Sequence, residues 1–386
     1  MSDKSLQLLG GISAAEFLCN YWQKKPCLIR AAIPGFSSFI SKAELLQLAL
    51  DPRVESRIVL ERDGEYPWQV IHGPATEQLY ADLPASHWTL LVQGVNLHHA
   101  GAAALLHSFS FIPNWRIDDV MISYAADQGS VGPHLDSYDV FLLQASGKRQ
   151  WCISTHNYSA EDYLAEADLG IIGEFEPQQQ WQLVAGDMLY LPPGVAHHGI
   201  ARGECMTCSI GFRAPTQHEL ISGFLEDRYD SAGDNQYSDP GLEPARYPGE
   251  IHRNDLDRIR AMMQAPLADA RSIETWFGRY ITALPEQFSA ETAPAPVSGT
   301  GLDEAISQGA RLLLHHASRA AFIQDQEEIQ LFVNGCAYRL PLRCRDVANK
   351  ISSYQPIERL DLGADVPSEC IQVLHDLYNK GILVSH

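Results

Sequence analysis

Two side chains suited to binding a metal stand two residues apart near the middle of the chain, His134 and Asp136. We expect them on a strand, where successive side chains point to opposite faces, so both should face the same way. An imidazole beside a carboxylate forms two-thirds of a 2-His-1-carboxylate triad. Such a triad leaves metal positions open and is typical of non-heme Fe(II) oxygenases. The third ligand must then come from elsewhere in the chain.

A second segment supplies candidates for that ligand. The short apolar run 188–191 is followed by Pro192-Pro193-Gly194, which breaks the strand and fixes the direction of the chain. Both His197 and His198 come just after this break. On these residues alone, either histidine could turn inward.

An oxygenase that uses 2-oxoglutarate also needs a cation for the far carboxylate of that co-substrate. Arginine suits this role because its guanidinium makes two parallel hydrogen bonds to a carboxylate. Arg149 lies on the strand that we expect to form a hairpin with the strand over 140–144. Lys148 is the alternative, and strand alternation points the two cations to opposite faces. Trp151 shares the face of Arg149 and could form a wall of the pocket.

Composition limits the class of protein. A length of 386 residues suggests two or three domains. We find no apolar run that approaches the roughly 20 residues needed to cross a bilayer, and no signal peptide, so we expect a cytoplasmic protein without a membrane segment. A net charge of −20 disfavours nucleic acid and favours basic partners. The 8 cysteines do not suggest a disulfide framework, and we interpret Cys205 and Cys208 as strand residues rather than a zinc site.

The elements that must position these residues are mostly strands. Residues 119–212 contain short β-type runs separated by turns rich in Gly, Pro and Asp, which predicts a double-sheet jelly roll of the cupin type. A polar, partly helical insertion is expected over 157–180. Two helices should precede the strands, with Ser13 and Ser41 as N-caps and a glutamate three residues after each.

The character of the chain changes after Pro215. Helices are expected over 217–229, 254–263 and 272–284. The last two are amphipathic and should pack on the barrel or on a second subunit. Residues 290–301 have the composition of a linker. Residues 302–386 predict a small α/β unit that ends in the helix–helix–strand order of a winged helix. Its helix over 367–380 is not basic, so we expect no direct DNA binding.

Taken together, the motifs resemble those of the bacterial Jumonji-C ribosomal-protein hydroxylases, which are similar to the human histidyl hydroxylases of ribosomal proteins. The similarity extends over nearly the whole chain. The domain order also fits: a Jumonji-C/cupin oxygenase domain over 1–214, a helical dimerisation region over 215–290 and a winged-helix domain over 300–386. The matching segments are 21–26, 72–74, 132–141, 191–197 and 209–215.

This resemblance implies an Fe(II)- and 2-oxoglutarate-dependent protein hydroxylase that consumes O2 and acts as a homodimer. Bacterial members hydroxylate the β-carbon of an arginine in a large-subunit ribosomal protein, so a basic ribosomal protein is the expected partner. Carried onto this chain, the iron ligands are His134, Asp136 and His197, and Arg149 binds 2-oxoglutarate. A positively charged substrate needs carboxylates near the mouth of the site. Asp118, Asp119 and Asp127 are nearby in sequence, and Asp127 is the residue that we expect to contact the substrate.

Two other functions fit part of the pattern. One is a 2-oxoglutarate oxygenase with a histidyl or other target, and the other is a non-catalytic regulator built from a cupin and a winged helix. The complete ligand set together with Arg149 argues against the regulator.

Overall fold

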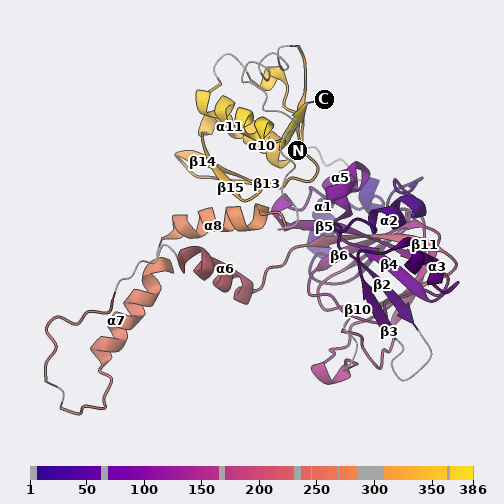
Figure 1. Ribbon diagram of the computed structural model, residues 1–386, viewed down its shortest axis with the longest axis horizontal. Helices are drawn as coiled ribbons and strands as arrows, with labels where there is room; N and C mark the ends of the chain where they lie inside the picture. The colour runs from indigo at the N-terminus through magenta and orange to yellow at the C-terminus, as the bar shows by residue number, and fades with distance from the viewer. Residues whose placement is uncertain are drawn as a thin grey trace. The chain divides into compact units, whose positions relative to one another are not determined.

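The computed structural model describes residues 7–61, 68–164, 170–229, 236–244, 246–267, 269–285, 302, 306, 308–362 and 366–385. Contacts divide the chain into two compact units, Met1–Ala214 and Pro215–His386 (Figure 1). No helix in these described ranges is long and apolar enough to cross a membrane. The expected linker over 290–301 lies outside the described residues.

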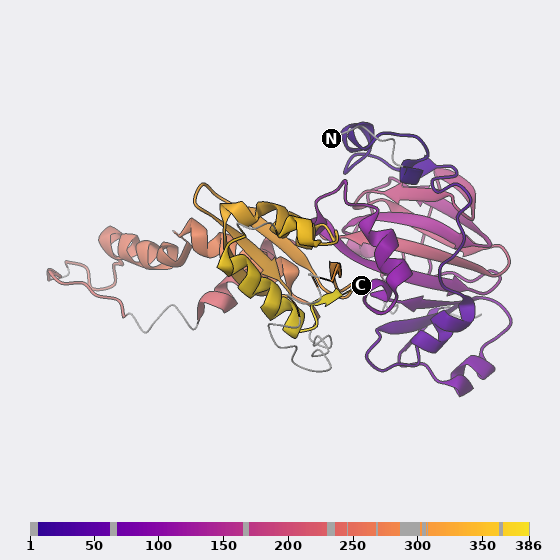
Figure 2. The ribbon, with the colours of Figure 1, turned by 90° about the horizontal axis from the view of Figure 1, so that it is seen from above.

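The first unit contains two antiparallel sheets. The large sheet has eight strands in the order β1-β9-β6-β11-β5-β4-β2-β3, and the small sheet has the order β10-β7-β8. Figure 2 shows the strands of this unit lying side by side. The strands are β1 (Cys27–Ile29), β2 (Ser56–Glu61), β3 (Trp68–His72), β4 (Trp88–Val92), β5 (Ile117–Ala125), β6 (Asp139–Ser146), β7 (Lys148–Ser154), β8 (Gln179–Val184), β9 (Met188–Leu191), β10 (Ala196–Ala201) and β11 (Cys205–Phe212).

From β5 onward the chain passes back and forth between the sheets, which confirms the predicted jelly roll. β6, β9 and β11 join the large sheet, whereas β7, β8 and β10 form the small one. Two local expectations were wrong. β6 and β7 do not pair, because Gly147, with φ 65°, turns the chain from one sheet to the other. The His134–Asp136 segment precedes β6 and is not a strand, although His134 forms an isolated antiparallel bridge with His197 of β10.

Short helices precede β5, and several pack against the outer face of the large sheet. Ser41 and Glu44 form the predicted capping box of α2, and Ser13 caps α1 by accepting a hydrogen bond from the Glu16 N–H. Phe17 of α1 is fully buried, with its ring 5.0 Å from that of Tyr190. These helices are α1 (Ala14–Asn20), α2 (Lys42–Leu48), α3 (Glu77–Asp82), α4 (Val95–His98) and α5 (Ala100–His107). In the expected insertion over 157–180, the only helical segment among the described residues is a 3-10 turn, Ala160–Asp162.

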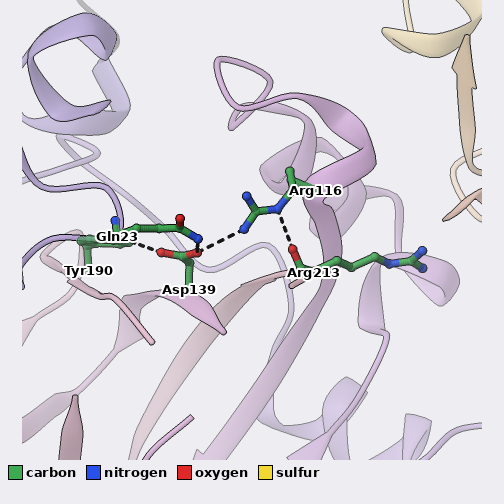
Figure 3. A network of polar contacts seen from close by, with 5 residues as sticks. All are labelled: Gln23, Arg116, Asp139, Tyr190 and Arg213. Carbon is green, nitrogen blue, oxygen red and sulfur yellow. Dashed lines mark hydrogen bonds and ion pairs between the residues drawn. The ribbon is translucent and has the colours of Figure 1, made fainter. Parts of the chain in front are cut away.

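A buried carboxylate connects the N-terminal segment to the start of β6 (Figure 3). Asp139 is fully buried and accepts hydrogen bonds from the Tyr190 hydroxyl at 2.6 Å and from Gln23 Nε2 at 2.9 Å. Arg116 forms an ion pair with the same carboxylate at 3.2 Å and donates to the Arg213 carbonyl at 2.6 Å. The network therefore fixes the chain three residues after Asp136.

We expect Asp139→Ala to destabilise the protein by about 3–5 kcal/mol, because it leaves buried donors and the Arg116 charge without a partner. Unfolding in urea, followed by circular dichroism, measures this loss. Asp51→Ala removes an exposed ion pair with Arg53 and serves as the control, with a much smaller expected change. Equal effects of the two variants would contradict this role of Asp139.

The second unit combines helices with two small sheets. α8 packs against the β13-β14-β15 sheet, and a Cβ on its Gly278 would meet the Phe332 ring at 2.3 Å, so the helix and the sheet approach closely. Trp276 of α8 packs edge-on against Phe224 of α6 at 5.4 Å. The elements are α6 (Gln217–Tyr229), α7 (Arg253–Gln264), α8 (Ala270–Thr282), β12 (Leu312–Leu314), β13 (Ala320–Gln324), β14 (Glu328–Val333), β15 (Cys336–Pro341), α10 (Arg345–Ser352), α11 (Ser368–Asn379) and β16 (Leu383–Ser385).

Candidate metal centre

The structure brings His134, Asp136 and His197 together. One potential ligand atom from each lies within 4.8 Å of the others, and His197 Nε2 is 3.7 Å from an Asp136 carboxylate oxygen. No other His, Cys, Asp or Glu cluster of this kind occurs in the described part of the chain. The bridge between the two histidine backbones holds a loop residue against β10, so residues far apart in sequence meet at one point.

Backbone carbonyls orient both imidazoles. His134 Nδ1 donates to the Gly132 carbonyl at 3.0 Å, and His197 Nδ1 donates to the Val195 carbonyl at 3.1 Å. These bonds place the ring proton on Nδ1 and leave each Nε2 lone pair available, the arrangement that ordinarily supports histidine ligands of metals. Burial and the neighbouring His134 lower the pKa of His197 to about 4, which keeps it neutral and able to coordinate. The three residues therefore fit a divalent metal with two imidazoles and one carboxylate.

His198 lies on the opposite face of β10. Its Nε2 is 2.9 Å from the Ser130 hydroxyl, and its ring packs edge-on against Phe175 at 6.1 Å. Alternation along the strand thus directs His197 into the cluster and His198 away from it.

A cavity of about 200 Å³ contains the cluster and reaches Arg149. Arg149 is 2% exposed, and its guanidinium donates to Ser123 Oγ at 3.4 Å and to the Gly199 carbonyl at 3.2 Å. Its Nε has no hydrogen-bond partner, and no acidic side chain in the described ranges forms an ion pair with it. Burial lowers the pKa of Arg149, yet an arginine stays charged. A buried cation without a counterion is unfavourable, so this end of the cavity is suited to an anion.

The surroundings of Arg149 fix its position. The guanidinium carbon lies 5.1 Å from the centre of the Trp151 ring, and Trp151 lines the cavity, as expected from the strand pattern. A Cβ at Gly199 would come within 2.6 Å of Arg149 Nε, so only glycine leaves this space open. Lys148 is exposed on the opposite face of β7 and does not line the cavity.

Of the acidic residues before the metal loop, Asp119 lines the cavity and Asp127 does not. Asp127 is exposed, and its carboxylate accepts from the Gly203 N–H at 2.7 Å. Asp119 accepts from the Gly94 N–H at 2.8 Å, and burial next to Asp118 raises its pKa to about 7. The prediction from sequence preferred Asp127 to Asp119, although alternation along β5 puts Asp119 on the same face as Ser123.

The two cysteines of the CxxC segment lie in β11, as expected. Both are buried, and burial raises the pKa of Cys205 and raises that of Cys208 to about 12. Neither belongs to a metal cluster in the described residues.

The JmjC domain family matches residues 104–220, which include all three residues of the cluster and Arg149. The ribosomal protein uL16 3-hydroxylase of Escherichia coli is 36% identical over 321 residues, which cover 83% of this chain and 84% of that protein. The chain belongs to the JmjC ribosomal oxygenases. A further relative, a probable ribosomal oxygenase of Haemophilus influenzae, is 30% identical over 70% of this chain and 68% of its own length.

Solved structures agree with this assignment. The E. coli ribosomal oxygenase YcfD aligns with a TM-score of 0.84 and 33% identity, covering 97% of this chain and 98% of that one. A complex of the same oxygenase with cobalt and 2-oxoglutarate aligns with a TM-score of 0.83 and 32% identity over 96% of this chain and 98% of that one. The mainly β fold predicted from the sequence is therefore that of a ribosomal oxygenase.

Proposed function

We propose that this protein is an Fe(II)- and 2-oxoglutarate-dependent dioxygenase that hydroxylates a ribosomal protein. The observation that carries the proposal is the pairing, in one cavity, of the His134, Asp136 and His197 cluster with a buried guanidinium that lacks a counterion. The cluster fits a metal with open coordination positions, and the guanidinium of Arg149 fits the distal carboxylate of 2-oxoglutarate.

The residues of the chain then have distinct tasks. His134, Asp136 and His197 would hold the iron, and Arg149 would bind and orient the co-substrate. When bound, iron supplies the oxidative chemistry by which 2-oxoglutarate and O2 yield succinate, carbon dioxide and one oxygen atom inserted into a substrate C–H bond. Trp151 lines the cavity beside Arg149, where its ring would pack next to the bound co-substrate. Positioning of the target carbon is the main contribution of the protein.

We infer that the target is the β-carbon of an arginine in a basic protein of the large ribosomal subunit. The position of Asp119 is evidence for a cationic substrate side chain, because this acidic residue lines the same cavity as the metal cluster. With its pKa raised to about 7, the ionised form that attracts a guanidinium gains population as the pH rises through neutrality. The net charge of −20 favours encounter with a basic partner in the cytoplasm.

The test is incubation of the purified protein with Fe(II), ascorbate, 2-oxoglutarate and ribosomal proteins, followed by succinate assay and intact-mass measurement. We expect succinate and one added oxygen atom on a single large-subunit protein, located on arginine by tandem mass spectrometry. Succinate with the oxygen on histidine, or on no ribosomal protein, would support a different target. No succinate under any condition would support the non-catalytic regulator.

Replacing Asp119 by asparagine should raise the KM for the protein substrate about 10- to 100-fold, because a charge-assisted hydrogen bond is lost. The KM for 2-oxoglutarate should keep its wild-type value. Asp127→Asn is the matched control, since this carboxylate is exposed and lies outside the cavity. A larger effect at position 127 than at position 119 would favour the assignment made from sequence.

We also propose that residues 215–290 mediate a homodimer, with residues 300–386 as an accessory winged-helix unit. The evidence is the apolar side of α7, a helix with no buried residue in the single chain. At helical spacing it exposes Leu256, Ile259 and Met263. Light scattering should give twice the mass of one chain, and Leu256→Ser with Ile259→Ser should give a monomer. Arg260→Ser is the control on the same helix, and a monomeric wild-type protein would overturn the proposal.

A further inference from the structure

The cavity extends beyond the jelly roll onto β2 and β4, the strands that enlarge the sheet. Arg57 of β2, Thr89 of β4 and Gln93, which follows β4, line it together with the metal cluster. Arg57 is opposite Leu91 in the β2–β4 register, and the Gln93 N–H donates to the Glu55 carbonyl at 2.9 Å. Arg57 and Gln93 are thus diagonal neighbours on one face of the sheet, roughly 7–8 Å apart at the backbone.

These side chains carry polar atoms without partners. Arg57 Nε, Gln93 Oε1 and Thr89 Oγ1 are all buried, and none has a hydrogen-bond partner among the described residues. No acidic side chain in the described ranges forms an ion pair with Arg57. Buried polar groups are nearly always hydrogen-bonded in folded proteins, so a cluster of unsatisfied ones along a cavity wall points to a ligand.

The chemistry of the pair restricts the ligand. Arg57 can only donate hydrogen bonds, whereas Gln93 carries an acceptor oxygen. A carboxylate would satisfy Arg57 and could accept from the Gln93 amide N–H groups, but it would leave the Gln93 oxygen without a donor. A peptide group offers one carbonyl acceptor and one N–H donor, so it can satisfy both side chains at once.

We propose that Arg57 and Gln93 bind a peptide group of the substrate main chain, next to the residue whose side chain enters the metal cavity. Arg57 donates to the carbonyl and Gln93 accepts from the N–H. This pair of positioning residues makes the enzyme selective for a side chain presented on an extended polypeptide. The inference rests on the proposed function, because it requires a protein substrate.

The test compares Arg57→Met and Gln93→Leu with the wild-type enzyme on a peptide that spans the hydroxylated residue. Each variant should raise the peptide KM about tenfold, with little change in kcat or in the KM for 2-oxoglutarate. Because both residues bind one group, the double variant should lose less than the product of the single effects. Arg53→Gln, at an exposed arginine paired with Asp51, is the control and should leave the peptide KM unchanged.

A series of peptides with single N-methylated amides identifies the group that is bound. In the wild-type enzyme, N-methylation at one position should raise the peptide KM about tenfold. In Gln93→Leu, N-methylation at that same position should raise the KM no further. Unchanged peptide KM values in both variants would overturn the inference and leave the proposed function intact. The inference would also be overturned if the loss in Arg57→Met depended on an acidic side chain of the peptide rather than on a main-chain amide. A wild-type enzyme that adds no oxygen to any ribosomal peptide would overturn the proposed function and this inference with it.

Discussion

Replacement of His134 by alanine is expected to abolish hydroxylation while the protein stays folded. His134 is only partly buried and lies in a loop outside the strands, so its truncation disturbs little packing. It removes one of three ligands, and metal affinity should fall by more than the 10–100-fold typical for loss of a supporting hydrogen bond. Cobalt binding, followed by titration calorimetry, measures this loss independently of activity, and circular dichroism reports the fold.

His198→Ala is the matched control for this variant. It removes a histidine adjacent to His197 in sequence but on the other face of β10, where it contacts Ser130. This variant should bind cobalt with nearly wild-type affinity. The ligand assignment would be wrong if His134→Ala still bound one equivalent of cobalt tightly, or if His198→Ala lost the metal instead.

Arg149→Met should raise the KM for 2-oxoglutarate about a hundredfold or more, since truncating one partner of a buried, hydrogen-bonded charge pair costs about 2–5 kcal/mol. The same variant should be at least as stable as the wild type without ligand, because it removes a buried charge that has no counterion in the described part of the chain. Succinate formation gives the KM, and thermal unfolding gives the stability.

Lys148→Met is the neighbouring control, on the exposed face of β7. Added 2-oxoglutarate with a divalent metal should raise the Tm of the wild type and of Lys148→Met, because a ligand that binds only the folded state stabilises it. It should raise the Tm of Arg149→Met much less. An unaltered KM in Arg149→Met would show that another cation binds the co-substrate.

Local sequence determined much of the candidate centre. The break before His197 and the strand alternation at Arg149 each specify a local geometry, whereas the spacing of His134 and Asp136 marked two candidate ligands but not their geometry, since the expected strand is absent. The structure agrees on which residues converge, and the family comparison agrees on the fold. The capping box of Ser41 and Glu44 was also predicted from the sequence, because capping depends only on neighbouring residues. Such features are encoded within a few residues of one another.

Pairing between distant strands decided the rest. The bridge from His134 to β10 replaced the expected strand, and Gly147 sent β7 to a different sheet from β6. Asp119 rather than Asp127 lines the cavity because Asp127 bonds to Gly203 at the β10–β11 turn, a partner far away in sequence. The unsatisfied atoms of Arg57 and Gln93 lie together because β2 and β4 pair in the large sheet. A sequence specifies which side chains lie on the same face of a strand, but the register between strands determines which of those faces line a common cavity.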